Sequence, residues 1–571
     1  MSKNQSAQYI ELRNALKDCK QYFIYAGLFS AAVNVLMLTP ILYMMAVYDR
    51  VVASGSLSTL AMLTLLMVGL LMASGGFEWV RSLILVSASN RIETNLRKRV
   101  SDATFRRALL SGGMVSNAQP IADLTALRQF LTGNGLFAFF DAPWFPIYLW
   151  VMFMFHPWFG IIGIVSGLLM VAMAFAQEAA TNKKLQDANN EANTASSQFQ
   201  GGLRNAEVVE AMGMADAIRR RYEERADNVL GLQADASQKA GMLAAATKSL
   251  RMILQSLALG LGAYLALNQQ ISPGMMIAGS LLLARALAPI DMLVGTWKAF
   301  SLARVQYRRL GEILEGIPAR RDTMSLPVPA GELSVEQVAV VPPGSQKVVV
   351  QGVTFNLLAG EAVGIVGPSA SGKSTLARAI LGIWPTYAGK VRLDGADIAA
   401  WDRAELGPHI GYLPQDIELF DGTIADNICR FDTPDSEKIV QAAKLAGVHD
   451  MILRLPQGYD TVIGGAGGML SGGQRQRIGL ARAVYGNPKL MVLDEPNSNL
   501  DDQGEKELVE ALRRIKAQGC TIVVITHRTM VLQCVDKILV MKGGAAVSFG
   551  DKDKVLASLV APAAVPKSAA S

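Results

Sequence analysis

The chain has 571 residues, of which 51% are hydrophobic and 18% charged, and its mean hydropathy is +0.27. This composition is too apolar for an ordinary soluble enzyme or for a disordered chain, so part of the chain is expected in a membrane. The net charge of +6 is compatible with binding to nucleic acid, with binding to an anionic membrane surface, or with basic cytoplasmic loops. The positions of the charged residues distinguish these three possibilities. The four cysteines form no CxxC pair and no metal-type spacing, which argues against a disulfide scaffold and a zinc site.

Long runs without charged residues predict the membrane spans. They lie between Lys20 and Asp49, between Arg50 and Glu78, between Asp141 and Glu178, and between Arg251 and Arg285. Because one span takes about 20 apolar residues, the first two runs hold one helix each and the last two hold two each. The six predicted spans are Tyr22–Val47, Leu57–Val86, Asn134–Phe155, Trp158–Ala176, Ser249–Asn268 and Pro273–Gly295.

Lysine and arginine are concentrated in the segments after the second and the fourth span. Positive charge beside a span resists translocation, so both segments, the N-terminus and everything after the sixth span are predicted to be cytoplasmic. This placement explains the basic charge without nucleic acid, and no nucleic-acid partner is expected. The first apolar run is too long for a cleaved signal peptide and is expected to remain as an anchor.

The two basic segments carry aliphatic residues at helical spacing, as in Ile92, Leu96, Val100 and Ala103. The spacing favours helices that continue out of the bilayer, and a solvated linker is the alternative. The expected parts of the chain are a cytoplasmic segment at 1–20, a membrane domain at 21–310, a linker at 311–331, a second domain at 332–560 and a disordered tail at 561–571.

A phosphate-binding loop is predicted after the apolar run 363–366, where the sequence reads GxxxxGKS and then continues with helix-forming residues. Glycines let the backbone N–H groups face phosphate oxygens, and the helix start adds favourable partial charge. We expect Lys373 to neutralise the β- and γ-phosphates and the Ser374 hydroxyl to bind Mg²⁺. A chance glycine-rich turn is the weaker alternative. The predicted nucleotide-binding residues here are Gly367, Ser369, Gly372, Lys373, Ser374 and Thr375.

A second apolar run, 490–493, ends in Asp494 and Glu495. A carboxylate at a strand end beside a phosphate loop can hold Mg²⁺, and the next one can polarise the attacking water. We assign the first role to Asp494 and the role of general base to Glu495. Such a pair is commonly only a strand end, so the assignment depends on the phosphate loop.

Between these motifs lies Leu470-Ser471-Gly472-Gly473-Gln474, and here the sequence resembles the nucleotide-binding domain of ATP-binding-cassette (ABC) proteins. LSGGQ is the signature of that family, and a serine and glycines at a helix start make a suitable cradle for a γ-phosphate. The resemblance implies that Ser471, Gly472, Gly473 and Gln474 bind ATP held by a second copy of the chain. A homodimer is therefore implied.

The same resemblance assigns three further positions. Gln415 matches the glutamine that senses Mg²⁺ and the membrane domain, Asp501 falls in the dimer-contacting loop, and His527 matches the histidine that reaches the γ-phosphate. A lone histidine would otherwise be read as a structural hydrogen-bonding group. The implied cofactors are ATP and Mg²⁺, with Ser374, Gln415 and Asp494 at the metal. The implied catalytic residues for ATP hydrolysis are Glu495, His527, Gln415 and Asp494.

Two stretches depart from the family pattern. Val340–Gly344 offers no aromatic residue to stack on adenine, and Pro342 is the candidate substitute. The stretch 463–467 lacks the acidic residue that many family exporters use to contact the membrane domain.

Six spans followed by one nucleotide-binding domain resemble a half-transporter exporter. The expected fold is therefore a membrane α-helical, six-helix ABC exporter domain joined to an α/β P-loop nucleotide-binding domain. By the same resemblance, short coupling helices are expected around Ala122–Leu127 and Glu207–Met212.

Four strings resemble the type I protein secretion branch, and within it the subgroup that exports metalloproteases and lipases. They are VYDRV at 47–51, DAPWFP at 141–146, RALAPID at 285–291 and DEPNSNLD at 494–501. The resemblance implies an unfolded secreted protein with an uncleaved C-terminal signal as substrate, a periplasmic adaptor and an outer-membrane channel as partners, and a multi-pass location in the bacterial inner membrane. No peptidase-type domain is expected before the first span.

Two other functions stay open at this point. The first is export of lipid or small amphiphiles, in which membrane lipid would be a binding partner and not only the surroundings of the helices. The second is an ATP-gated channel or regulatory scaffold, against which Glu495 and His527 argue because both are present.

Asp141 and Arg285 are ionisable groups inside predicted spans, where exposure to lipid costs a few kcal/mol. They are therefore expected to face a cavity or each other. One hypothesis is that both line or gate the translocation path, and the alternative is a structural ion pair between helices.

Overall fold

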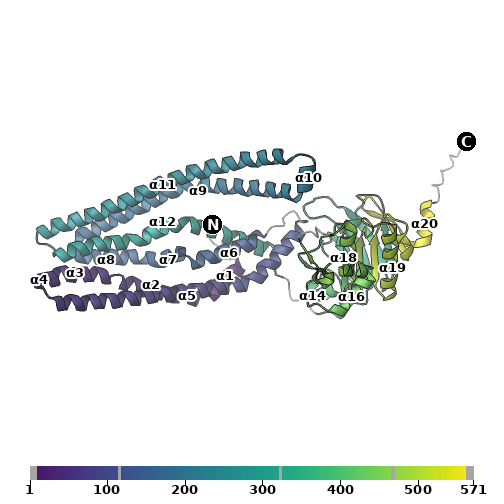
Figure 1. Ribbon diagram of the computed structural model, residues 1–571, viewed down its shortest axis with the longest axis horizontal. Helices are drawn as coiled ribbons and strands as arrows, with labels where there is room; N and C mark the ends of the chain where they lie inside the picture. The colour runs from purple at the N-terminus through teal and green to yellow at the C-terminus, as the bar shows by residue number, and fades with distance from the viewer. Residues whose placement is uncertain (1–8, 113–117, 320–324, 465–469, 561–571) are drawn as a thin grey trace. The chain divides into compact units, whose positions relative to one another are not determined.

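The computed structural model describes residues 9–112, 118–319, 325–464 and 470–560 (Figure 1). The chain divides into two compact units, Met1–Thr104 with Asn117–Pro318, and Phe105–Ser116 with Ala319–Ser571. The predicted segment 1–20 is helical from Ile10, and its first eight residues lie outside the described part. The predicted tail 561–571 also lies outside it.

The first unit is helical, and its described residues contain six helical segments long and apolar enough to cross a membrane, as predicted. These are Lys20–Ser54, Leu57–Leu110, Gly135–Phe155, Pro157–Leu203, Ala215–Leu267 and Pro273–Gly316. The helices that form the unit are α1 (Ile10–Asp18), α2 (Lys20–Leu36), α3 (Thr39–Ala46), α4 (Val52–Ser54), α5 (Leu57–Leu110), α6 (Gln119–Thr132), α7 (Asn134–Asp141), α8 (Phe145–Phe155), α9 (Pro157–Arg204), α10 (Ala206–Ala211), α11 (Ala215–Leu267) and α12 (Pro273–Gly316).

Four of the described helices continue far beyond the apolar spans. α5 has 54 residues, α9 has 48, α11 has 53 and α12 has 44, whereas about 20 residues cross a bilayer. α9 and α11 pack along each other and are joined by α10 (Figure 1). The second candidate coupling segment falls on α10, and the first falls inside α6, where Asp123, Leu124 and Leu127 are buried. α12 runs to Gly316, so the predicted linker 311–331 begins as helix, and its residues 320–324 lie outside the described part.

Small residues let these helices approach closely. A Cβ placed at Gly279 of α12 would lie 2.6 Å from the ring of Phe159 in α9, and one at Gly262 of α11 would lie 3.1 Å from the same ring. Phe159 is fully buried. Glycine at these two positions therefore makes room for one aromatic ring between three helices, as is common in membrane bundles.

The N-terminus of α12 is capped by the π-helical turn Val47–Val51 that ends the first span. The Asp49 carboxylate accepts hydrogen bonds from the Ser272 hydroxyl (2.6 Å) and the Gly274 backbone N–H (2.8 Å). A carboxylate at a helix start satisfies N–H groups that have no partner within the helix. This contact fixes the first span against the last one.

The second unit is an α/β domain built on a six-stranded sheet of order β12-β11-β3-β10-β9-β6. All neighbours in it are parallel except β11 and β12. β3, β9 and β10 are almost wholly buried apolar runs, as expected of strands covered on both faces. The strands are β3 (Ala362–Val366), β6 (Ile410–Leu413), β9 (Leu490–Asp494), β10 (Thr521–Ile525), β11 (Lys537–Lys542) and β12 (Ala545–Asp551).

A second sheet has the order β2-β1-β4-β5, and all its neighbouring strands are antiparallel. Its strands are β1 (Leu333–Val340), β2 (Val350–Leu357), β4 (Ala388–Leu393) and β5 (Ala396–Asp397), and β7 (Gly422–Thr423) pairs separately with β8 (Val462–Ile463). The helices are α13 (Lys373–Ile380), α14 (Arg403–Leu406), α15 (Ile424–Ile428), α16 (Ser436–Leu445), α17 (His449–Leu453), α18 (Gly472–Val484), α19 (Asp502–Ala517) and α20 (Lys552–Val560). This architecture is the predicted α/β P-loop domain.

Candidate functional site

The predicted phosphate loop joins β3 to α13, and its shape requires glycine. Gly367 has φ +153° and Gly372 has φ +92°, which side-chain-bearing residues rarely adopt. A Cβ at Gly367 would lie 2.1 Å from the Met541 carbonyl oxygen. The loop also holds Ser369, which is exposed, and it leads into Ser374 and Thr375 at the start of α13.

Lys373 folds back over this loop. Its Nζ donates hydrogen bonds of 2.9 Å to the carbonyl oxygens of Gly367 and Pro368. Burial lowers the pKa of Lys373, while the nearby Glu495 and Asp494 carboxylates partly offset that effect. Among the described residues the ammonium group has no ion pair, so an anion at the loop would supply the missing negative charge.

Asp494 at the end of β9 has the opposite requirement. It is only 2% exposed, and its Oδ1 is buried without a hydrogen-bond partner. Burial raises the pKa of Asp494, and a hydrogen bond from Ser374 counteracts the rise. A cation bound between Asp494 and Ser374 would satisfy the orphan oxygen and favour the carboxylate, so these residues fit Mg²⁺.

Three predicted catalytic side chains meet directly beyond this edge of the sheet. Nε2 of Gln415 lies 3.1 Å from one carboxylate oxygen of Glu495, and Nε2 of His527 lies 3.6 Å from the other. Glu495 has φ +48°, and its N–H donates to the Ile525 carbonyl of β10 at 2.9 Å. A non-glycine residue in this region is strained, and such strain concentrates at functional sites.

The signature residues begin α18. Ser471 and Gln474 form a reciprocal cap: the Gln474 N–H donates to the Ser471 hydroxyl (3.2 Å), and the Ser471 N–H donates to the Gln474 side chain (2.8 Å). A Cβ at Gly473 would lie 3.0 Å from the Asn499 carbonyl oxygen, and one at Gly472 would lie 3.5 Å from the Asn499 side chain. The glycines of the signature therefore face the segment after β9 of their own chain.

Asp501, predicted at a dimer contact, caps α19. Its carboxylate accepts the Gly504 N–H at 2.8 Å. In the candidate adenine stretch, Pro342 is half-buried just after β1. The departure at 463–467 falls at the end of β8, and residues 465–467 lie outside the described part.

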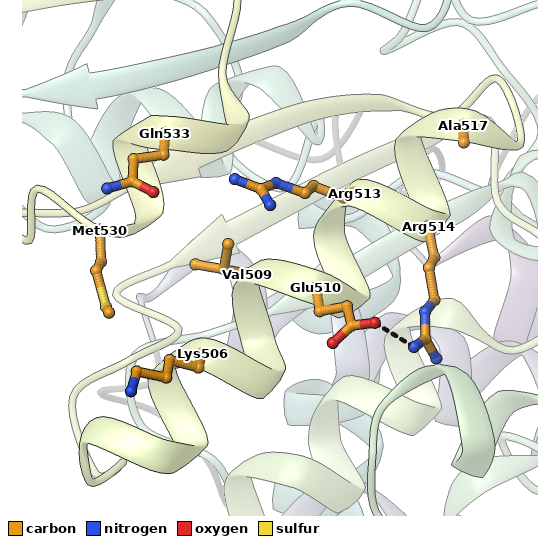
Figure 2. Close-up of a pocket in the computed structure, with 8 residues that line it drawn as sticks. All are labelled: Lys506, Val509, Glu510, Arg513, Arg514, Ala517, Met530 and Gln533. Atoms are coloured by element: carbon orange, nitrogen blue, oxygen red, sulfur yellow. Dashed lines mark hydrogen bonds and ion pairs between the residues drawn. The ribbon is translucent and has the colours of Figure 1, made fainter.

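The hollow drawn in Figure 2 is a different feature of the same unit. It has a volume of about 580 Å³, lies beside α19, and contains an ion pair between Glu510 and Arg514. Its lining residues are Lys506, Val509, Glu510, Arg513, Arg514, Ala517, Met530 and Gln533. None of the predicted nucleotide-site residues lines it.

In the helical unit, the ion-pair partner of Asp141 is Arg81 of α5. Nη1 of Arg81 lies 3.1 Å from Oδ1 of Asp141, and Arg81 is only 3% exposed. Oδ1 of Asp141 also accepts 2.8 Å hydrogen bonds from the Ser30 hydroxyl and the Asn34 amide of α2. The Arg81 guanidinium lies 4.2 Å from the centre of the Phe137 ring. The cluster joins three helical segments by an ion pair between a buried arginine and a partly buried carboxylate.

Arg285 of α12 lies elsewhere: its Nη2 contacts the Met37 sulfur at 2.6 Å. Among the described residues it forms no ion pair with Asp141, so the alternative of an interhelical pair between these two residues is wrong, and Asp141 pairs with Arg81 instead. Sequence reasoning missed Arg81 because this residue lies inside the predicted span Leu57–Val86 but after Glu78, where the charge-free run of that span ends. An arginine within a predicted span was the available signal.

Sequence reasoning also missed Gln476 of α18, which is only 2% exposed and bonds to the backbone around Glu495. Its place in the polar string Gln474–Arg477 gave no sign of burial.

Comparison with known proteins identifies the family. Residues 23–289 match the family described as ABC transporter transmembrane region, and residues 350–498 match the family described as ABC transporter. The chain is 44% identical to the type I secretion system ATP-binding protein PrsD of Rhizobium meliloti (strain 1021), over 97% of this chain and 95% of that protein. The chain belongs to the type I secretion branch of the ABC exporters.

More distant relatives agree with this assignment. The chain is 28% identical to the cyclolysin secretion/processing ATP-binding protein CyaB of Bordetella pertussis, over 91% of this chain and 74% of that protein. It is 27% identical to the alpha-hemolysin translocation ATP-binding protein HlyB of Proteus vulgaris, over 94% of this chain and 76% of that protein.

The fold is shared with a bacterial Atm1-family ABC exporter solved with ATP bound. The TM-score is 0.78 at 24% identity, covering 97% of this chain and 99% of the other. The chain is thus a multi-pass membrane protein that binds ATP and couples its hydrolysis to transport.

Replacing Glu495 with glutamine should lower ATP turnover by about 100-fold or more, because a general base contributes roughly that factor. Binding of ATP, measured by equilibrium titration of the full chain in detergent, should persist because the phosphate loop is untouched. Glu437→Gln, the same change at an exposed position of α16, is the matched control. Undiminished turnover in Glu495→Gln would contradict the assignment.

Replacing Arg81 with alanine leaves the Asp141 carboxylate in the bundle without its cation, which should cost about 3–5 kcal/mol of unfolding free energy. The cost is measured by thermal unfolding of the full chain in detergent. Arg285→Ala is the comparison variant and should cost less. Exchanging the charges, Arg81→Asp with Asp141→Arg, should restore part of the loss. Equal stability of Arg81→Ala and wild type would show that the pair is dispensable.

Proposed function

We propose that this chain exports an unfolded protein across the bacterial inner membrane as the ATPase component of a type I secretion system, with a protease or lipase that keeps its C-terminal signal as substrate. The observation that carries the proposal is the similarity to a type I secretion protein over nearly the whole chain, together with a set of ATPase residues at one sheet edge. A periplasmic adaptor and an outer-membrane channel complete the path, and the ATPase domain is cytoplasmic.

The nucleotide site works through groups already close together. ATP supplies the triphosphate, and Mg²⁺ supplies positive charge against it. The loop Gly367–Thr375 and Lys373 would hold the phosphates, while Ser374, Asp494 and Gln415 would hold the metal. Glu495 would orient and deprotonate the attacking water, and His527, whose Nε2 lies beside the Glu495 carboxylate, would contact the γ-phosphate.

Hydrolysis in this proposal requires two copies of the chain. The signature residues Ser471–Gln474 are placed at a helix start, where N–H groups favour an anion. Within one chain their glycines contact Asn499. A second copy would bring its signature to the ATP on the first copy's loop, with Asp501 at the contact, and a homodimer results.

In the membrane domain, we propose that Arg285 lies along the translocation path. Its described contact is the Met37 sulfur, so its charge lacks a carboxylate among the described residues. Asp141 is proposed to act on the same path through its ion pair, which would change partners as the bundle rearranges. The segments near α10 and α6 are proposed to transmit movement to the ATPase domain.

The proposal is tested by secretion. The chain is produced with its adaptor and channel in cells that also produce a secreted protease bearing its own C-terminal signal. Wild type should release the protease into the medium, whereas Lys373→Ala should abolish release because the phosphates lose their cation. Glu437→Gln should release as much as wild type.

The class of exported substrate is tested by measuring the ATP turnover of the purified chain with different added compounds. Stimulation by a peptide of the protease C-terminus supports protein export. Stimulation by lipid alone, with protease retained in the cells, would contradict it and favour export of lipid or amphiphiles.

A further inference from the structure

The buried side chain of Gln476 connects the signature helix with the backbone around Glu495. Gln476 lies in α18, two residues after the last signature residue, and is 2% exposed. Its amide nitrogen donates to the Pro496 carbonyl and, at 3.5 Å, to the Glu495 carbonyl. Its amide oxygen accepts the Asn499 N–H at 3.0 Å.

All three backbone partners of Gln476 belong to the short segment that follows β9. This segment starts with Glu495, whose φ of +48° is unfavourable for a side-chain-bearing residue. The Glu495 N–H is held by the Ile525 carbonyl, and its carbonyl is held by Gln476. The strained backbone of the base is therefore fixed from the sheet on one side and from α18 on the other.

A second contact strengthens this connection. The close approach of Gly473 to the Asn499 carbonyl, 3.0 Å for a Cβ at that glycine, leaves the signature little freedom to move without the segment. On its far side, the Asn497 side chain accepts a 3.2 Å hydrogen bond from the Thr526 hydroxyl. Thr526 directly precedes His527, so this segment, which begins with Glu495, is bonded to the signature helix on one side and to the residue before His527 on the other.

We propose that Gln476 is a positioning residue that transmits the position of the signature helix to the general base of the same chain. The inference rests on the proposed function, in which the signature of a chain contacts ATP on the partner's loop while Glu495 serves ATP on its own loop. Gln476 then couples the two ATP sites of the dimer, because ATP engaged by the signature at one site sets the backbone of the base at the other.

A purely structural role for Gln476 predicts a different outcome. Asn427 of α15 is an equally buried amide that bonds only to backbone groups, those of Phe420 and Thr423, away from the catalytic segment. Loss of either amide leaves buried polar groups unpaired and should lower stability to a similar degree. Only Gln476, however, should affect turnover by folded protein.

The first experiment compares Gln476→Met with Asn427→Leu in the full-length dimer, since both replacements keep side-chain volume and remove the amide. For Gln476→Met, kcat should fall about tenfold, the rate equivalent of a buried hydrogen bond or two. The KM and the equilibrium binding of ATP should stay within about twofold of wild type. Asn427→Leu should keep the wild-type kcat per folded molecule. Equal kcat values for the two variants would overturn the positioning role.

The second experiment tests the coupling with mixed dimers isolated through two different tags, in which one chain carries Gln476→Met. Coupled sites predict a loss of turnover of at least about fivefold, because the slowed site delays the other. If turnover falls only by about half, the two sites hydrolyse ATP independently, and that result would overturn the coupling.

Wild-type protein in the same preparation separates this inference from the proposed function. A wild-type chain that hydrolyses ATP fully as a monomer would disprove the proposed dimer. If the wild-type dimer hydrolyses ATP cooperatively and the Gln476→Met variant keeps the wild-type kcat, only the role of Gln476 is disproved.

Discussion

The structure of the ATPase domain depends on bringing together, at one edge of a sheet, the groups that a triphosphate and its metal require. β3, β9 and β10 run parallel and side by side, so the phosphate loop, Asp494 and the residues after Ile525 all follow strand ends at that edge. In the described part of the chain neither Lys373 nor Asp494 forms an ion pair. Burial lowers the pKa of Lys373 and raises the pKa of Asp494, which favours the neutral form of each. A nucleotide phosphate beside Lys373 and a metal ion beside Asp494 would favour the charged form of both groups.

A similar constraint governs the membrane bundle, where each charge must find a partner away from lipid. Arg81 and Asp141 satisfy it by pairing, and Ser30 and Asn34 donate hydrogen bonds to the same Asp141 oxygen, Oδ1, that Arg81 contacts. Asp49 satisfies it by capping α12. These polar contacts join helices that are otherwise held together by apolar packing.

Much of this arrangement could be predicted from the sequence, because its signals are local. The charge-free runs located the six spans, and strand–loop–helix order located the phosphate loop. Contacts between distant segments could not be read in the same way. Arg81 lies 60 residues from Asp141 along the chain, and only helix packing makes them partners. Gln476 stands between two arginines in a string that looks solvent-exposed, and its burial follows from the fold of the segment after β9.

The most direct test of the account is a disulfide between two chains. The native cysteines are all buried, so Ser369→Cys in one tagged chain and Ser471→Cys in a second, differently tagged chain introduce exposed thiols on the phosphate loop and the signature. With Glu495→Gln in both chains to retain ATP, oxidation should give a disulfide linking the two tags only when ATP and Mg²⁺ are present. A link that forms equally without nucleotide, or none at all while ATP is bound, would contradict the shared nucleotide site.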